Sequence, residues 1–325
     1  GLGRIGEPNA LAGYLEALPF SRAVLMPCQD HWVRATSRLD PTLRERFLWS
    51  GPSSECVAVL LDKESTLDAL ERFSVPRPRT VRLRSESDLS AMDDSRDAEW
   101  FLKPTDSQAV RGRFGAKALR VASRDEAARH LMEIQQAELD VVLQEYVPGG
   151  ADCHYFLDGF VDRGGVVRAC FSRRRVRMWP PDFGDSSFMR SVPAEETAPA
   201  GESLKRLLSG VGHRGIFSAE FKRDPRDGEF RLIEVNVRPW AYVEFTTSCG
   251  VNTPWMAYRD ALGQSVQDVG DYPAGRAGGV LSKDYRSFLA MRRQGRLGLG
   301  AWARSWWPAR DLIFRWDDPL PGLAQ

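Results

Sequence analysis

Cysteine and histidine are scarce in this chain of 325 residues, which holds five of the former and four of the latter. The cysteines lie far apart without a C-x-x-C pair, which argues against a disulfide scaffold and against a structural zinc site. The histidines form no H-x-x-x-H or H-E-x-x-H array, and no G-x-S-x-G sequence occurs. Zinc peptidase and serine hydrolase mechanisms are therefore excluded.

The chain also lacks an excess of charge and a long hydrophobic run. Lys and Arg total 45 against 44 for Asp and Glu, so no overall positive field attracts nucleic acid, and we expect no nucleic-acid partner. No apolar stretch approaches the ~20 residues of a membrane-spanning helix, and no signal-peptide core follows a basic start. We therefore expect a cytoplasmic protein without a transmembrane segment.

What is present indicates a globular protein of two or three lobes. Hydrophobic residues make up 42% and charged residues 27% of a chain longer than most single domains. In the first 75 residues, the apolar runs Ala23–Pro27 and Val57–Leu61 are typical of buried strands and alternate with helical stretches. This order predicts a small α/β layer.

The next segment predicts an α+β lobe. Short strands are expected at 99–104, 118–121 and 141–147, with a helix at about 124–137. That helix begins with Ser123 as its N-cap and Glu126 three residues later, which is the capping-box pattern.

A predicted β-hairpin further along carries the most informative residues. Its strands, 216–222 and 230–237, flank a five-residue turn; Glu234 and Asn236 point to one face, and antiparallel pairing can add Glu220. Two carboxylates and an amide oxygen form a hard-oxygen site that suits Mg²⁺. The alternative is a solvated strand face with charge pairs.

A second strand-like segment is rich in arginine. If it is extended, Arg173, Arg175 and Arg177 lie on one side and form a local cationic wall in a neutral protein. Such a wall would bind phosphate or carboxylate groups. The alternative is a solvated edge strand.

The hairpin sequences Glu220–Asp224 and Leu232–Pro239 resemble the metal-binding signature of the ATP-grasp superfamily, in its carboxylate–amine ligase branch. Within that branch the chain is similar to D-aspartate ligase-like and carbamoyl-phosphate synthase large-subunit-like proteins. Asp62-Lys63, Phe101–Pro104 and Leu143–Gly149 resemble further motifs of the family, in the same order. The ordered set is more specific than any of its members.

The resemblance covers roughly residues 20–265 and implies an ATP-grasp fold, of mixed α/β and α+β class. A pre-ATP-grasp α/β domain, either complete or incomplete at its N-terminus, is expected in residues 1–80. Two α+β lobes that clasp the nucleotide are expected at 81–147 and 148–264. Residues 265–325 would form a basic, Trp-rich extension.

The resemblance also assigns roles to residues, with ATP and Mg²⁺, or Mn²⁺ in its place, as cofactors. Glu220, Glu234 and Asn236 would hold the metal. Residues implied to bind the nucleotide are Lys63, Lys103, Lys117, Gln144, Glu145, Val147 and Asp152. Residues implied to act in catalysis are Arg175, Arg177 and Arg238. The chain departs from many relatives in its loop 105–117, which has only two glycines, and in Arg175, where relatives often carry lysine.

The implied activity is an ADP-forming ligase that joins a carboxylate to an amine, or to a thiol, through an acylphosphate. Its substrates would be small molecules, amino acids or peptides, and a homodimer is compatible with the sequence. The alternative, prompted by the glycine-poor loop and by Arg175, is a nucleotide-binding protein that does not ligate, or a phosphotransferase on the same scaffold.

Two further segments have expected roles, one on the substrate side of the site and one near the C-terminus. Residues 240–259 hold aromatic and polar side chains that would line the acceptor side or pack into the core. The segment 301–307 could form an amphipathic helix that docks on a partner, on a membrane surface or on the body of the protein. We favour docking on the body.

Overall fold

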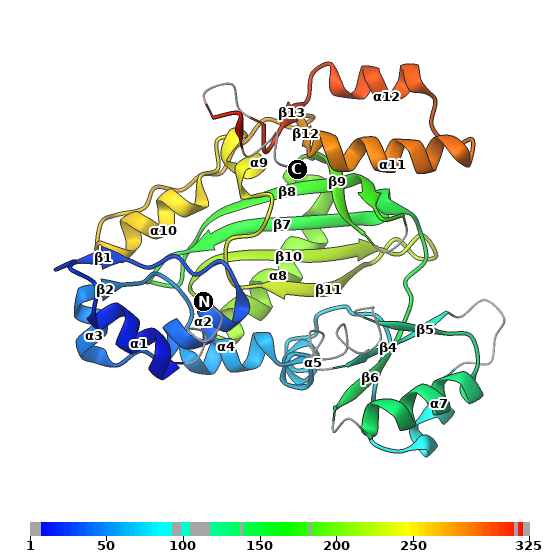
Figure 1. Ribbon diagram of the computed structural model, residues 1–325, viewed down its shortest axis with the longest axis horizontal. Helices are drawn as coiled ribbons and strands as arrows, with labels where there is room; N and C mark the ends of the chain where they lie inside the picture. Colours follow the sequence, from blue (N-terminus) through cyan, green and yellow to red (C-terminus); the bar gives the residue numbers. More distant parts are fainter. Residues whose placement is uncertain are drawn as a thin grey trace.

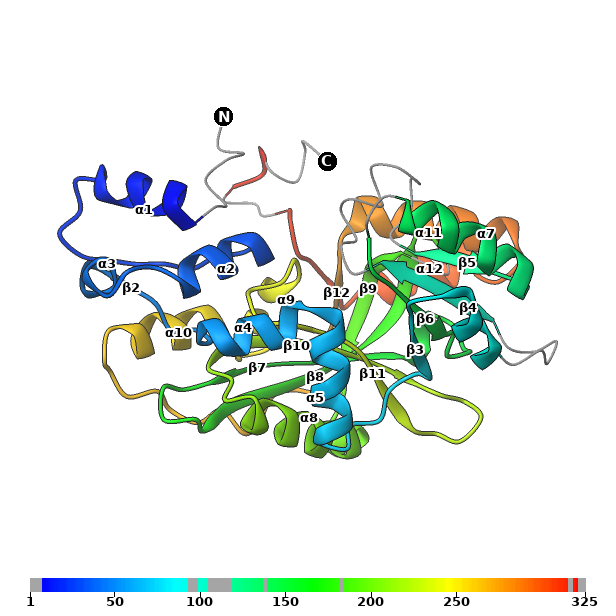
Figure 2. The same ribbon diagram turned by 90° about the horizontal axis from the view of Figure 1, so that it is seen from below.

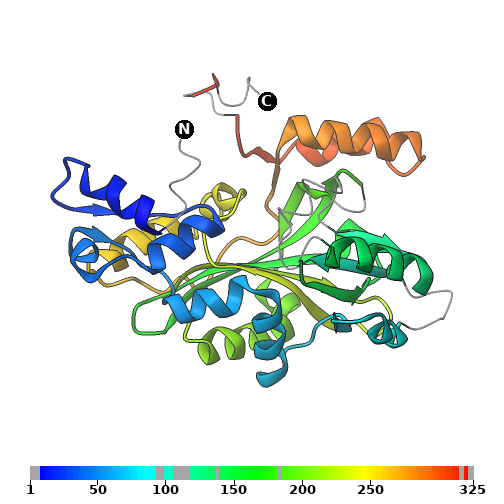
Figure 3. The same cartoon turned by 60° about the horizontal axis from the view of Figure 1, so that its bottom comes forward.

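The computed structural model describes residues 8–92, 99–104, 118–136, 139–181, 184–314 and 318–320. A large sheet occupies the centre of the molecule, with the N-terminal helices at one end and a smaller sheet at the other (Figures 1 and 3). Among the described residues, no helix is both long enough and apolar enough to cross a bilayer.

The large sheet has seven strands in the order β11-β10-β7-β8-β9-β12-β13. Its strands pair antiparallel, except that β12 and β13 are parallel. The strands are β7 (His154–Val161), β8 (Val167–Trp179), β9 (Asp185–Ser191), β10 (Gly215–Arg223), β11 (Phe230–Asn236), β12 (Ala277–Gly279) and β13 (Arg310–Asp311). The hairpin β10–β11 has the predicted antiparallel pairing.

Helices α4, α5 and α8 pack on one face of the large sheet (Figure 2). Apolar residues of α4, α5 and α8, among them Leu60, Leu70 and Leu204, form one core with Leu157 and Phe217 of the sheet. These helices are α4 (Ser54–Leu61), α5 (Lys63–Arg72) and α8 (Ala198–Gly210), which follows the short 3₁₀ helix η4 (Ala194–Thr197). This burial is the main source of stability for the central layer.

The opposite face of the sheet is divided in two. At one end, α9 (Val243–Ser248) and α10 (Thr253–Ala261) bury a second core around Phe160, Phe171 and Phe245. The rest of this face carries charged side chains from β7, β8, β10 and β11, and the small sheet lies over that part (Figure 3).

The small sheet has the order β3-β6-β4-β5 and is entirely antiparallel. Its strands are β3 (Thr80–Leu83), β4 (Trp100–Pro104), β5 (Leu119–Val121) and β6 (Val141–Glu145). Helix α7 (Arg124–Gln135) and the 3₁₀ helix η2 (Glu86–Ala91) pack on it. Ser123 caps α7 as predicted, while the Glu126 side chain accepts a hydrogen bond from Ala122 N rather than from Ser123 N.

The N-terminal unit corrects one sequence-based expectation. The two-residue strands β1 (Ala23–Val24) and β2 (Phe47–Leu48) pair in parallel, with α1 (Pro8–Glu16), α2 (Asp30–Ser37) and α3 (Pro41–Arg46) around them. The strand predicted at Val57–Leu61 is wrong, because these residues belong to α4. A short apolar run fits a buried helix as well as a strand, and here Ser53 accepts a hydrogen bond from Cys56 N and starts a helix.

The C-terminal segment packs on the body through α11 (Leu281–Arg293) and α12 (Leu299–Trp306). Trp302 and Trp306 of α12 donate hydrogen bonds to the buried Asp284 of α11. The Trp306 ring also packs against Phe188 of β9. Of the three docking alternatives for this segment, the structure shows packing on the body.

Candidate functional site

A cavity of about 380 Å³ lies between the small sheet, helices α4 and α5, and strand β11. We refer to it as the inter-sheet cavity. It brings together five of the predicted site residues, which come from four separate elements: Lys63, Lys103, Gln144, Glu234 and Asn236. Asp30, Asp62, Arg77 and Thr80 also line it. The predicted site is therefore assembled from segments far apart in the sequence.

Two opposed carboxylates form the centre of the site. Glu220 of β10 pairs directly with Glu234 of β11, and Ser218 pairs with Asn236, so these residues share one face of the sheet. Ile233 is an extra residue on β11 between the pairs Glu220–Glu234 and Phe221–Leu232, and this bulge shifts the alternation of β11, so that Leu232 and Val235 both enter the same core. The predicted convergence of Glu220 on the face of Glu234 and Asn236 is present.

The two carboxylates have different surroundings. Glu220 Oε1 accepts a hydrogen bond of 2.6 Å from His154 Nδ1 and one of 3.1 Å from Arg175 Nη2. Burial acts to raise the pKa of Glu220, but Arg175 and His154 outweigh it and lower this pKa to about 2. Burial, followed by the charges of Glu220 and Asp30, raises the pKa of Glu234. One carboxylate is thus held ionised beside another whose charge is disfavoured.

This arrangement fits a divalent cation. Within the described residues, neither Glu220 Oε2 nor the Glu234 carboxylate accepts a hydrogen bond; the Glu220 side chain is half-buried, and Glu234 is exposed to solvent. Two opposed carboxylates repel each other, and a cation bound between them would remove this repulsion. The described residues contain no cluster of three or more His, Cys, Asp or Glu side chains for a metal. Two carboxylates and one amide would leave coordination positions for water or phosphate oxygens, as Mg²⁺ prefers.

Lys103 lies beside these carboxylates on β4. Its ammonium group donates a hydrogen bond to Gln144 Oε1, and Gln144 Nε2 donates one of 3.0 Å to Thr80 Oγ1. Burial lowers the pKa of Lys103, against the opposing effect of Glu234 and Glu220. Lys103 is thus a partly buried cation in the inter-sheet cavity, positioned by strand β4 and by Gln144, whose amide oxygen and nitrogen both make hydrogen bonds.

The segment after β6 has an open backbone edge. Glu145 N donates to Arg79 O, and Tyr146 N donates to Glu99 O. In the part of the chain that the structure describes, the Glu145 carbonyl and the N–H of the buried Val147 have no hydrogen-bond partner. One acceptor and one donor two residues apart can bind the edge of a planar heterocycle.

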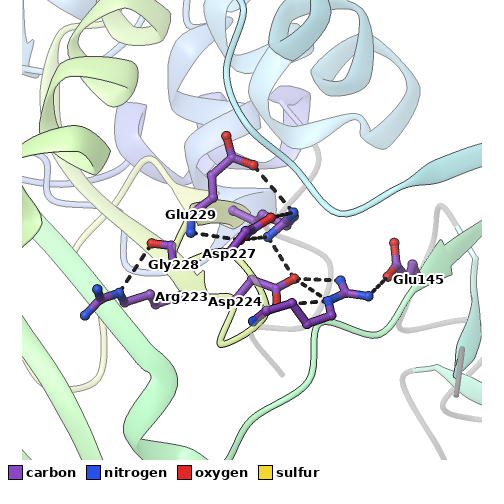
Figure 4. A network of polar contacts seen from close by, with 8 residues as sticks. Glu145, Arg223, Asp224, Asp227, Gly228 and Glu229 are labelled. Carbon is purple, nitrogen blue, oxygen red and sulfur yellow. Dashed lines mark hydrogen bonds and ion pairs between the residues drawn. The ribbon is translucent and has the colours of Figure 1, made fainter.

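A polar network holds this edge to the β10–β11 turn (Figure 4). Arg226 donates one hydrogen bond of 2.6 Å to Glu145 and others to Asp224, which is fully buried. Arg231 also contacts Asp224, at 2.8 Å. Glu145 therefore contributes its side chain to the connection between the two sheets and leaves its carbonyl group free.

The structure separates the three arginines of β8. All are buried on a central strand, so the solvated edge-strand alternative is wrong. Arg175 contacts Glu220 and belongs to the site. Arg173 pairs with Asp158 at 2.6 Å, and Arg177 pairs bidentately with Asp284 of α11 at 2.8 Å. Each guanidinium has its own carboxylate, so the predicted cationic wall is neutralised, and Arg177 is not brought to the carboxylate pair.

Arg238 and Asp152 are each engaged in a pair as well. Arg238 Nε donates to Asp30 at 2.6 Å, which joins the end of β11 to α2. Arg174 contacts the exposed Asp152 at 3.1 Å, next to the 3₁₀ helix η3 (Ala151–Cys153). Lys117 and the loop 105–117 lie outside the described residues.

Residues 240–259 divide between the core and the site. Trp240 and Phe245 are buried in the second core, as expected for structural aromatics. Tyr242 donates a hydrogen bond to Ser186 O, and Ser186 Oγ accepts one of 3.0 Å from Arg175. Lys283 Nζ is 3.2 Å from Tyr242 Oη. Tyr242 thus extends the polar surface that begins at Glu220.

Another cavity of about 380 Å³ lies elsewhere, between the N-terminal unit and α10. It is lined by Arg44, Trp49, Arg163, Arg214 and Asp260, among others. None of the predicted site residues lines it. Of the other predicted site residues, Asp152 and Arg177 line a separate cavity of about 410 Å³, and Arg238 lines a small one near Trp49.

Sequence analysis missed His154, Asp30 and Lys222 as residues of the site. His154 contacts Glu220, Asp30 contacts Arg238, and Lys222 follows Glu220 by two positions on β10. Alternation along β10 could have indicated Lys222. The other two contacts join residues 66 and 208 positions apart, which no local pattern reveals.

Comparison with solved structures identifies the fold. The L-amino acid ligase from Bacillus licheniformis superposes with a TM-score of 0.62 at 17% identity, over 85% of this chain and 66% of that one. The biotin carboxylase domain of the Hydrogenobacter thermophilus 2-oxoglutarate carboxylase, solved with MgADP and bicarbonate, gives 0.66 at 14% identity, over 83% and 60%. Both are ATP-grasp proteins.

The chain has the ATP-grasp fold. The predicted fold class is confirmed, and so is the resemblance to two groups of relatives. D-aspartate ligase of Enterococcus faecium (strain Aus0004) is 24% identical over 70% of this chain. The C-terminal section of the carbamoyl phosphate synthase large chain of Methanopyrus kandleri is 20% identical over 82%. This ATP-grasp chain spans about half the length of these relatives, 56% and 49% respectively. No protein-family model matches it.

Proposed function

We propose that this chain is an ADP-forming ligase that joins a carboxylate to an amine through an acylphosphate. The observation that carries the proposal is the opposition of Glu220 and Glu234, where Glu234 lines the same cavity as Lys103 and Lys63. Two opposed carboxylates, of which Glu234 accepts no hydrogen bond from the described residues, and two partly buried lysines fit a site that is completed by a metal–triphosphate complex. The relatives named D-aspartate ligase and L-amino acid ligase support amino acids as substrates.

The nucleotide would lie along the inter-sheet cavity. Lys63 and Lys103 would bind its phosphate oxygens, while the Glu145 carbonyl and Val147 N–H would bind the base, with Asp152 at the ribose. Glu220, Glu234 and Asn236 would hold Mg²⁺, or Mn²⁺ in its place. When bound, the metal supplies positive charge to the phosphate oxygens and lowers the repulsion toward an anionic nucleophile.

The chain's own cations act on the reacting groups. A substrate carboxylate oxygen attacks the γ-phosphorus, a new C–O–P linkage forms, and the bond to the bridging oxygen of ADP breaks. The amine nitrogen then attacks the acyl carbon, the bond to phosphate breaks, and the amine proton passes to solvent. Arg175 would stabilise negative charge on the transferred phosphoryl group. Arg238 would exchange its contact with Asp30 for one with the substrate carboxylate.

Hydroxylamine provides a test that needs no knowledge of the amine. The 325-residue chain is incubated with Mg-ATP, hydroxylamine and single carboxylates from a panel of amino acids, and ADP and hydroxamate are measured. Equal amounts of ADP and hydroxamate with one carboxylate support the ligase, because hydroxylamine traps an acylphosphate. ADP release without hydroxamate would indicate a phosphotransferase, and nucleotide binding without ADP release would indicate a non-ligating protein.

Two alanine variants, one in the site and one on the surface, distinguish a specific loss of activity from a general effect of substitution. Glu234→Ala should remove hydroxamate formation, whereas Glu202→Ala, on the exposed face of α8, should not. Full activity of the Glu234→Ala variant would refute the metal-site assignment.

A further inference from the structure

One buried cation of the ATP-grasp face has no place in the proposed chemistry. Lys222 of β10 is only 2% exposed. Among the described residues its ammonium group has neither a hydrogen bond nor an ion pair, and its one recorded contact is the face of the Tyr146 ring, 4.0 Å from the ring centre. Buried lysines are rare unless they are paired, because removing an ammonium ion from water is costly.

Neighbouring carboxylates do not neutralise Lys222 directly. Glu220, two positions earlier, is shared by His154 and Arg175, and Asp224, two positions later, by Arg226 and Arg231. Burial lowers the pKa of Lys222 to about 8, with Cys153 and Glu220 opposing the effect and Arg175 adding to it. A cation–π contact offsets only part of the cost of burial.

The position of Lys222 indicates which ligand would stabilise it. Its contact, Tyr146, lies between Glu145 and Val147, whose carbonyl and N–H groups are the open backbone edge. Lys222 is also on the same face of β10 as Glu220. An acceptor-rich ring bound at that edge would therefore have beside it Lys222, a cation that has no hydrogen-bond or ion-pair partner among the described residues.

We propose that Lys222 is a base-contacting residue of the nucleotide site, which donates a hydrogen bond to an acceptor atom of the purine. This inference rests on the proposed function, because it requires a nucleotide in the inter-sheet cavity. The base is then bound by three groups, the Glu145 carbonyl, the Val147 N–H and the Lys222 ammonium. The lysine contributes to affinity for the base, and not to affinity for the phosphates.

Calorimetry with two probes tests this assignment. The probes are the magnesium complex of a non-hydrolysable ATP analogue and magnesium tripolyphosphate, which has no base. Lys222→Met removes the charge at similar volume, and Lys205→Met, on the exposed face of α8, is the control. A hydrogen bond from a charged donor contributes about 1.5–3 kcal/mol, so the Lys222 variant should bind the ATP analogue about 10- to 100-fold more weakly. Its affinity for tripolyphosphate should equal that of the wild type.

Thermal unfolding without ligand separates this role from a structural one. The Lys222→Met variant should be as stable as the wild type or more stable, since it no longer buries an unpaired charge; a structural lysine would give a lower Tm. Equal affinity of variant and wild type for the ATP analogue, or an equal loss for both probes, would overturn the proposal. If the wild type binds neither probe, the proposed function fails as well, so the two failures are distinguishable.

Discussion

Two clusters of acids and arginines on the same sheet differ in how completely their carboxylates are bonded. Asp284 is fully buried and accepts five hydrogen bonds, from Arg177 twice, Ser187, Trp302 and Trp306. Glu220 and Glu234, in contrast, face each other, and Glu234 accepts none from the described residues.

This difference distinguishes charged residues that stabilise the fold from charged residues that bind a ligand. A fully satisfied carboxylate has no capacity left for a ligand, so the Asp284 cluster fastens α11 and α12 to the sheet. Two opposed carboxylates, of which Glu234 accepts no hydrogen bond from the described residues, are explained by a ligand that is bound during activity. Arg177 and Arg175, which the sequence pattern treats alike, belong to different clusters.

The largest effect is expected at Asp284. Asp284→Asn should lower the free energy of unfolding by about 3–5 kcal/mol, because Arg177 remains buried without its charge partner. Urea unfolding measures this loss, with the exposed Asp271→Asn as control. Turnover per folded molecule should stay near that of the wild type. Unchanged stability with reduced turnover would place Arg177 in catalysis and break the comparison.

The next effect is expected at the unsatisfied pair. Glu234→Ala should lower ADP release by at least about 100-fold, since even residues that only support metal ligands contribute 10- to 100-fold. The Tm of the ligand-free variant should equal or exceed that of the wild type, because the repulsion from Glu220 is removed. A lower Tm together with retained ADP release would show that Glu234 is structural.

Low pH should remove the contribution that the ionised Glu220 side chain makes to the free energy of unfolding. The folded pKa of Glu220, about 2, lies below the usual 4.5, so the stability contributed by its ionisation is present above pH 4.5 and is lost as the pH falls toward 2. Glu220→Gln should be less stable than the wild type at pH 7, and the gap should narrow by on the order of 2 kcal/mol by pH 2–3. Urea unfolding at several pH values measures this difference in the free energy of unfolding. A difference that does not change with pH would contradict the contacts of ionised Glu220 with His154 and Arg175.

The smallest effect is expected where the two sheets meet at the surface. Arg226→Met removes the contact with Glu145 but leaves Asp224 bonded to Arg231. Exposed ion pairs contribute about 0.2–1 kcal/mol, so affinity for an ATP analogue should fall by about fivefold at most. Arg223→Met, at the end of β10 next to this turn, is the control for general effects. A much larger loss would indicate direct contact with the nucleotide.

Sequence reasoning predicted the fold class and much of the central part of the site. The hairpin was predictable because a turn-rich segment separates two strands of the right length, and alternation placed Glu234 and Asn236 on one face. The strand predicted at Val57–Leu61 failed because an apolar run carries no periodicity to distinguish strand from helix. The domain boundaries stay a prediction.

The sequence by itself determined the order of the motifs, the face shared by the hairpin carboxylates, and the buried or polar character of most strands. Only the tertiary structure decided which partner each charge receives. Arg173, Arg175 and Arg177 are equivalent by alternation, yet Asp158, Glu220 and Asp284 reach them from three different elements. A buried charge depends on whichever group folding brings within hydrogen-bond distance, and that distance is not encoded in local spacing.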